Sequence, residues 1–282
     1  MVIFFTLPPW RISYPYILIN NQHPEYGLRY LIRYNHRKEV KKIIIDSGIE
    51  IFRNKNIKDY PGGGKAQITR QYILYSKIRK IVPHAEVYAV VPDYCDDYHP
   101  KNLWLDEKIT NIERTTENIL YAVEKYSNVK WLIPIQGHYM KPKTVMKALE
   151  QLKEHGFDFE KFGYYAVAPT CILLDVNLLK FTVAYAYSWF KQNLGYVPKI
   201  HVFGPKLKAI PYIKQYIYSF DSMAWTRPVE QGLHKKHPYS AKTEQQRELF
   251  FKKYLEVLEK KYKINILGSD SKNNVGESGW FG

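Results

Sequence analysis

Four polar side chains that could act in chemistry each follow closely on a hydrophobic run. The runs are residues 43–45, 87–91, 131–135 and 216–220, and the side chains are Asp46, Asp93, Gln136 and Asp221. Two carboxyl groups suit glycosidic chemistry, because one attacks or stabilises the sugar carbon while the other handles the leaving-group proton. The Gln136 carboxamide suits the edge of a heterocyclic base, and Asp93 suits the donors of a guanine-like face. Alternatively, each Asp caps a helix or forms a turn.

Strands that alternate with helices must position these side chains. The hydrophobic pattern predicts strands at residues 43–45, 86–91, 130–135, 162–167, 198–203 and 215–220. Apolar residues at helical spacing predict helices at 65–82, 106–126, 142–155, 175–193, 206–213 and 241–261. This alternation indicates a parallel sheet, which binds ligands at the carboxyl ends of its strands. The number of units favours an α/β fold of the closed (β/α)8 barrel type over a doubly wound open sheet.

The length of the chain fits one domain. It has 282 residues, of which 45% are hydrophobic, and a barrel of this type takes about 250 residues. We expect a single TIM-barrel domain over residues 1–268. Residues 1–40 read as strand-like pieces, with Tyr16–Ile19 as the best strand, and the polar segment 269–282 reads as a flexible tail.

Positive charge dominates the composition, with 42 Lys and Arg against 27 Asp and Glu and a formal net charge of +15. This charge favours a nucleic-acid partner, because neutralising phosphates releases counterions; the alternative explanation is a generally lysine-rich composition. The candidates for phosphate contact are Arg227, Lys235 and Lys236. The start has no basic leader and no run approaches the roughly 18 apolar residues of a membrane span, so we expect a cytoplasmic protein without membrane contact.

Metal ligands are scarce. The two cysteines, Cys95 and Cys171, lack paired spacing, and no His-Xaa-His motif occurs, so we expect neither metal nor cofactor. His201 lies inside a predicted strand and reads as a core histidine, whereas His138 is a candidate for the mouth of the barrel. The run Pro-Gly-Gly-Gly-Lys at 61–65 fits a phosphate-binding loop, a lid or a plain flexible loop.

Six short segments carry a family resemblance through their order along the chain. They are Ile45-Asp46-Ser47-Gly48, Val91-Pro92-Asp93-Tyr94, Ile133-Pro134-Ile135-Gln136-Gly137, Tyr165-Ala166-Val167-Ala168, His201-Val202-Phe203-Gly204 and Ser219-Phe220-Asp221-Ser222-Met223-Ala224-Trp225. In this order the chain resembles the tRNA-guanine transglycosylase superfamily, and most closely its DNA-modifying branch, the DpdA-type DNA guanine transglycosylases. The resemblance covers about residues 43–228.

The resemblance implies an enzyme that exchanges guanine in a polynucleotide for a 7-deazaguanine base such as preQ0. It implies that Asp221 attacks the anomeric carbon and holds a covalent intermediate, and that Asp46 handles the proton of the leaving and incoming bases. The base-binding residues that it implies are Ser47, Asp93, Gln136, Gly137, Ala168 and Gly204.

The sequence departs from the family pattern at several places. Where the family has an aromatic residue that stacks on the base, this chain has Glu50 and Ile51, with Phe52 just beyond. The zinc-binding Cys/His insertion and an RNA-binding module of the tRNA enzymes are absent from the sequence, which favours DNA over tRNA as the partner. Partner proteins could supply additional contacts to the nucleic acid. A non-catalytic nucleic-acid-binding barrel and a metal-dependent hydrolase stay open as alternatives.

Overall fold

The computed structural model describes residues 2–35, 38–55, 57–94, 110–171, 173, 175–227 and 242–264. Eight strands within these ranges form one parallel sheet. They are β1 (Ile3–Phe5), β2 (Tyr16–Asn20), β3 (Lys42–Asp46), β4 (Glu86–Val90), β5 (Trp131–Ile135), β6 (Tyr164–Val167), β7 (Lys199–Val202) and β8 (Ser219–Asp221). Most strand residues are buried, as expected for a parallel sheet that helices cover.

The sheet closes on itself. Its strands pair in the order β1-β8-β7-β6-β5-β4-β3-β2, and an isolated parallel bridge between Thr6 and Ile17 joins the chain after β1 to β2. Thr6 N donates to Tyr16 O at 3.2 Å, and Leu18 N donates to Thr6 O at 2.9 Å. The predicted single-domain (β/α)8 barrel is therefore confirmed, and the open doubly wound sheet is wrong.

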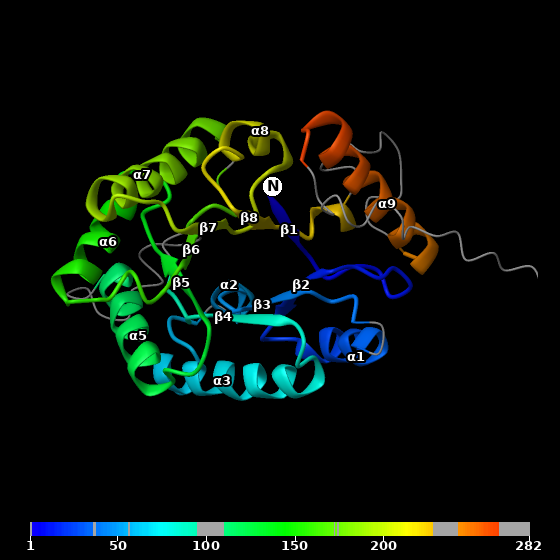
Figure 1. The fold of residues 1–282 in the computed structure, drawn as a ribbon, viewed down its shortest axis with the longest axis horizontal. Helices are drawn as coiled ribbons and strands as arrows, with labels where there is room; N and C mark the ends of the chain where they lie inside the picture. Colours follow the sequence, from blue (N-terminus) through cyan, green and yellow to red (C-terminus); the bar gives the residue numbers. More distant parts are fainter. Residues whose placement is uncertain are drawn as a thin grey trace, which may run out of the picture.

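Helices accompany the strands, and most of them lie in a ring around the strands, as Figure 1 shows. They are α1 (Pro24–Tyr34), α2 (Glu50–Lys55), α3 (Gly63–Ile81), α5 (Asn111–Lys125), α6 (Thr144–Glu154), α7 (Val176–Leu194), α8 (Ile210–Ile213) and α9 (Glu244–Glu256). Short 3-10 turns precede α8 and follow β8, namely η2 (Leu207–Ala209) and η3 (Ala224–Thr226), and the π-helical turn η4 (Val257–Lys261) continues α9. The predicted helices are present with somewhat different ends, and the predicted helix positions 106–109 and 241 lie outside the described residues.

Side-chain caps fix the starts of three helices. Thr110 and Glu113 form a capping box at α5, and Thr243 and Gln246 form another at α9. Asp175 accepts from two backbone N–H groups at the start of α7. Such caps satisfy N–H groups that have no partner within the helix.

Two helices and one strand differ from the sequence expectation. Residues 24–34 form α1 instead of strand-like pieces, because the buried positions 27, 28, 30, 31 and 34 recur at helical spacing. The short helix α2 lies where a loop is expected. Strand β8 starts at Ser219 rather than 215, because Tyr216 N still donates to Ile213 O at the end of α8. The strand also ends later than expected, and Asp221 is its last residue.

Within the described ranges, no helix combines the length and the apolar character needed to cross a membrane. The expected tail at 269–282 lies outside the described residues.

Candidate active site

A cavity of about 230 Å³ lies at the carboxyl ends of the strands, where barrels of this type hold their active sites. Seven residues singled out from the sequence line it: Asp46, Ser47, Asp93, Gln136, Ala168, Gly204 and Asp221. The structure thus brings the four chemistry-bearing side chains to one place, although they are up to 175 positions apart in the sequence (221 − 46). Their individual roles stay predictions.

Asp93 is the centre of a buried polar unit. Asp93 is 3% exposed. Ser47 Oγ donates to Asp93 Oδ1 at 2.9 Å, and Gln136 Nε2 donates to Asp93 Oδ2. Burial raises the pKa of Asp93 to about 6, and the two hydrogen bonds limit that rise. The unit joins side chains that follow three neighbouring strands, β3, β4 and β5.

Gln136 has an unused acceptor. It is 1% exposed, and its Oε1 has no hydrogen-bond partner among the described residues. Leaving a buried acceptor unpaired costs about 1–3 kcal/mol. A ligand that offers an N–H group to this oxygen would remove that cost.

Asp46 ends β3 and lines the cavity. Gln71 Nε2 fixes the backbone here, since it donates to the carbonyl oxygens of Ile45 (2.9 Å), Asp46 (3.1 Å) and Val90 (3.0 Å) where sheet pairing stops. Burial, and then the charges of Asp221 and other nearby carboxylates, raise the pKa of Asp46 to about 8. At neutral pH this carboxyl group keeps its proton and can act as a general acid.

The Asp221 side chain is 13% exposed, and one of its two oxygens has protein partners. His201 Nε2 lies 3.0 Å from Oδ1, and Gly204 N donates to the same atom at 3.1 Å. Gly204 has a φ of 49°, which glycine adopts readily, and this turn aims its N–H at the carboxylate. Within the described part of the chain, no hydrogen bond engages Oδ2, so this oxygen is available to a ligand.

The cavity is acidic although the protein is basic. Asp46, Glu50, Asp93 and Asp221 all line it, and none of the lining residues that the structure describes is Lys, Arg or His. A lining rich in carboxyl oxygens favours ligands that offer N–H donors.

Apolar side chains form the walls of the cavity. They are Leu18, Ile49, Phe203 and Met223. Phe52, the aromatic residue nearest to the Asp-Ser-Gly motif, packs elsewhere, with its ring 4.7 Å from Tyr60 and 5.7 Å from Tyr94. A planar ligand would therefore lie against Phe203 and the aliphatic walls rather than against Phe52.

The expectation that Gly137 lines the pocket is wrong. A Cβ at this position would lie 2.7 Å from Val145 Cγ1 and 3.0 Å from Thr144 Oγ1, so the glycine faces the start of α6. His138 also lies apart from the cavity lining and stacks on Tyr139. The absence of a Cβ allows close packing of α6 rather than contact with a base.

Of the predicted phosphate contacts, the described part of the chain includes Arg227, which is not among the residues that line the cavity. Arg227 is exposed and follows η3, and Lys235 and Lys236 lie outside the described residues. Trp225, between Asp221 and Arg227, is buried and donates from Nε1 to Thr6 Oγ1 at 2.9 Å, so it packs under the loop. Contact of these basic residues with nucleic acid stays a prediction.

The glycine run at 62–64 has a structural explanation. Gly62 has a φ of 79° and is the N-cap of α3. A Cβ on Gly64 would lie 2.3 Å from Asn118 Oδ1, and Asn118 Nδ2 donates to Pro92 O at 2.8 Å. The run starts α3 and allows α5 to approach closely. Asn118 of α5 can then bind the carbonyl oxygen of Pro92, the residue before Asp93.

Sequence reasoning missed the polar residues whose side chains bind the backbone of the site residues. Gln67 Nε2 donates to Ser47 O at 2.9 Å, and Tyr60 OH donates to Asp93 O at 2.9 Å. Gln67 and Gln71 are buried and four positions apart, among the buried apolar residues of α3 that include Ile68 and Tyr75. Polar residues on a buried helix face were the available signal.

Groups that could hold a metal ion are absent from the described ranges. Cys171 lines the cavity, and Cys95 lies outside the described residues.

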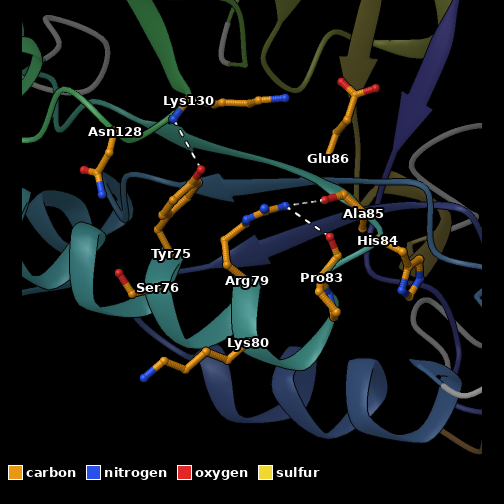
Figure 2. Close-up of a pocket in the computed structure, with 10 residues that line it drawn as sticks. All are labelled: Tyr75, Ser76, Arg79, Lys80, Pro83, His84, Ala85, Glu86, Asn128 and Lys130. Atoms are coloured by element: carbon orange, nitrogen blue, oxygen red, sulfur yellow. Dashed lines mark hydrogen bonds between the residues drawn. The ribbon is translucent and has the colours of Figure 1, made fainter.

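A second, larger cavity of about 600 Å³ lies at the amino ends of β4 and β5 (Figure 2). Its residues include Arg79, Lys80, His84, Glu86 and Lys130. Arg79 Nη1 is engaged by the carbonyl oxygen of Ala85 at 3.0 Å. We place the candidate active site at the smaller cavity, because the perturbed carboxyl groups and the unpaired Gln136 oxygen are there.

Comparisons with known proteins give little further information. No protein-family model and no curated protein matches the chain. Among solved structures, the carboxyl transferase domain (variant Y628A) of Rhizobium etli pyruvate carboxylase with pyruvate is similar, at 11% identity and a TM-score of 0.38 over 90% of this chain. The chain spans about half of that protein, 49% of its length.

Proposed function

We propose that this protein is a guanine transglycosylase that exchanges guanine in DNA for a 7-deazaguanine base such as preQ0. The observation that supports this most is the shared cavity of Asp46, Asp93, Gln136 and Asp221. Two of its carboxyl groups have raised pKa values, to about 8 for Asp46 and about 6 for Asp93. A volume of about 230 Å³ is below the usual range for drug-sized ligands and suits a single base.

In the proposed first half-reaction, Asp221 Oδ2 forms a bond to C1′ of the sugar. The bond from C1′ to the guanine nitrogen breaks, its electron pair passes to the base, and the protonated Asp46 carboxyl group supplies the proton. The incoming base then gives a proton to Asp46 and displaces Asp221 from C1′. One acid/base group serves both half-reactions because they are near mirror images.

Base recognition follows from the hydrogen bonds of the Asp93 unit. Ser47 and Gln136 occupy one oxygen each of Asp93, which fixes the amide so that Oε1 of Gln136 points away from it. Guanine offers N–H donors along one edge, and Gln136 Oε1 is a matching acceptor. The carboxylates around the cavity add further acceptors.

The basic composition supports a polynucleotide substrate. A base in a duplex must leave the stack before it reaches such a cavity, at a cost of a few kcal/mol. Attraction of the backbone to the basic protein would offset part of that cost.

Exchange of labelled guanine into DNA and into tRNA tests this function. Incorporation into DNA, and its loss in Asp221→Ala, is the expected result. Incorporation into tRNA alone would make tRNA the substrate. Salt-sensitive binding of DNA without exchange would instead support a non-catalytic binding barrel.

A further inference from the structure

A chain of buried polar groups lies behind Asp221. His201 is fully buried, with its Nε2 3.0 Å from Asp221 Oδ1 and its Nδ1 2.8 Å from Ser219 Oγ. Ser219 Oγ in turn contacts the hydroxyl of Tyr164, and both residues are buried. Three barrel strands, β6, β7 and β8, supply these groups.

One arrangement of protons gives every hydrogen of this chain an acceptor within it. Burial raises the pKa of Tyr164 well above its usual value, so its hydroxyl keeps its proton, and Ser219 Oγ is the acceptor that it contacts. Tyr164 then donates to Ser219, Ser219 donates to Nδ1 of His201, and Nε2–H of His201 donates to Asp221. The reverse arrangement would place an unprotonated Nε2 against a carboxylate oxygen and leave the tyrosine proton without an acceptor in this chain.

Aromatic rings hold the imidazole in place. The ring centroids of Phe203, Phe5 and Tyr164 lie 5.0, 6.0 and 6.3 Å from that of His201. The imidazole does not line the cavity, so it acts on a ligand only through Asp221.

We propose that His201 is a positioning residue for Asp221: together with Gly204 N it holds Oδ1 and leaves Oδ2 to attack C1′. This role rests on the proposed transglycosylase function. When Oδ2 bonds to C1′, Oδ1 becomes the carbonyl oxygen of the ester. When the incoming base displaces the ester, the electron pair of the C1′–Oδ2 bond returns to the carboxylate, and the two donors stabilise the charge that develops on Oδ1.

Substitutions at position 201 separate positioning from packing. His201→Phe keeps an aromatic ring in an aromatic environment but removes the donor to Asp221. We expect the rate of adduct formation with random-sequence single-stranded DNA to fall about 10- to 100-fold, as for a lost hydrogen bond to a charged group. The KM for guanine should stay unchanged, because His201 does not line the cavity.

Three further variants make this test specific. His201→Gln offers an N–H donor at a similar reach and should restore most of the rate. Ser219→Ala removes the group that orients Nδ1 and should slow the reaction less than His201→Phe. The matched control is His155→Gln, an exposed histidine at the end of α6, which should behave as wild type.

A measurement on the substrate-free protein completes the test. Two-bond ¹H–¹⁵N spectra of histidine-labelled protein, assigned with His201→Gln, should show a proton on Nε2 and none on Nδ1 of His201. Any other pattern overturns the hydrogen-bond chain whether or not the protein is active. Wild-type rates in a folded His201→Phe overturn the positioning role alone, whereas absence of exchange in the wild type overturns the proposed function and this role with it.

Discussion

Asp46 and Glu86 are on neighbouring strands of the barrel, but at opposite ends, and their surroundings are opposite. Asp46, at the carboxyl end of β3, shares a cavity with three other carboxyl groups, and its pKa is raised to about 8. Glu86, at the amino end of β4, has Lys42 Nζ 3.0 Å from one oxygen and accepts from Tyr88 OH at 2.7 Å on the other. Burial alone would raise the pKa of Glu86, but these hydrogen bonds and nearby lysines lower it.

The difference shows that charge is distributed unevenly in this molecule. The amino end pairs its carboxylate with cations, and the larger cavity there is lined by Arg79, Lys80 and Lys130 (Figure 2). At the carboxyl end, burial raises the pKa of Asp46 and of Asp93, and the charges of nearby carboxylates raise that of Asp46 further. Carboxyl groups perturbed in this way are typical of functional sites.

Asp46→Asn should have the largest effect on the proposed reaction. Because the Asp46 proton is lost as the pH rises through about 8, wild-type exchange should decline above that pH. The variant should be slower by about 10²–10⁴-fold, with no decline of this kind in a pH profile of single-turnover rates. A variant that keeps the alkaline decline would show that another group supplies the proton.

The same substitution should increase stability. The pKa of Asp46 is about 8 in the folded protein and near 4 in the unfolded chain. Its contribution to the stability of wild type is complete below about pH 4 and is lost as the pH rises toward 8. Asn does not ionise and avoids this loss. Because pH 7 is about three units above the unfolded pKa and each unit is worth about 1.4 kcal/mol, the variant should gain roughly 4 kcal/mol in free energy of unfolding at pH 7. Urea unfolding should show this gain at pH 7 and little of it at pH 4. An equal gain at both values would assign it to packing.

Ser47→Ala should weaken the binding of free guanine about 10-fold, because it removes one hydrogen bond that orients Asp93. Loss of this donor should also raise the pKa of Asp93 above its present value of about 6. Calorimetric titration with guanine measures the first effect. Ser76→Ala, in the amino-end cavity, is the matched control and should bind guanine as the wild type does.

Glu86→Gln should have the smallest effect. It should leave base exchange unchanged and reduce stability by at most about 1 kcal/mol, because the ion pair with Lys42 is partly exposed. A lowered pKa stabilises the fold above the usual value of 4.5, and this stability is lost as the pH falls through the folded pKa. The difference from wild type should therefore shrink in acid. A large loss of base exchange would show that the amino end of the barrel also takes part in the reaction, and would contradict the assignment of the active site to the carboxyl end alone.

The sequence predicted the barrel because its strands and helices have distinct periods and recur in order. The regular units from residue 43 onward were visible in this way, and the polar residues at strand ends had to meet once the sheet was parallel. Helix α1 was missed because its Tyr and Ile content resembles that of strands, although its buried positions have helical spacing.

The details of the site could not be read from the sequence, because they depend on packing between distant residues. Gly137 faces α6 and Phe52 packs with Tyr60 and Tyr94, which no local pattern indicates. The contact of His201 with Asp221 depends on the register of β7 beside β8, where His201 lies opposite Ser219. That register follows from the closed sheet rather than from either strand alone.

The central claim is that Asp221 forms a covalent bond to the sugar, and mass spectrometry of acid-quenched protein after incubation with guanine-containing DNA tests it most directly. We expect a sugar-linked adduct on the peptide that contains Asp221, formed by wild type and absent from Asp221→Asn. Base exchange that proceeds with no adduct, or with the adduct on Asp46, would contradict it.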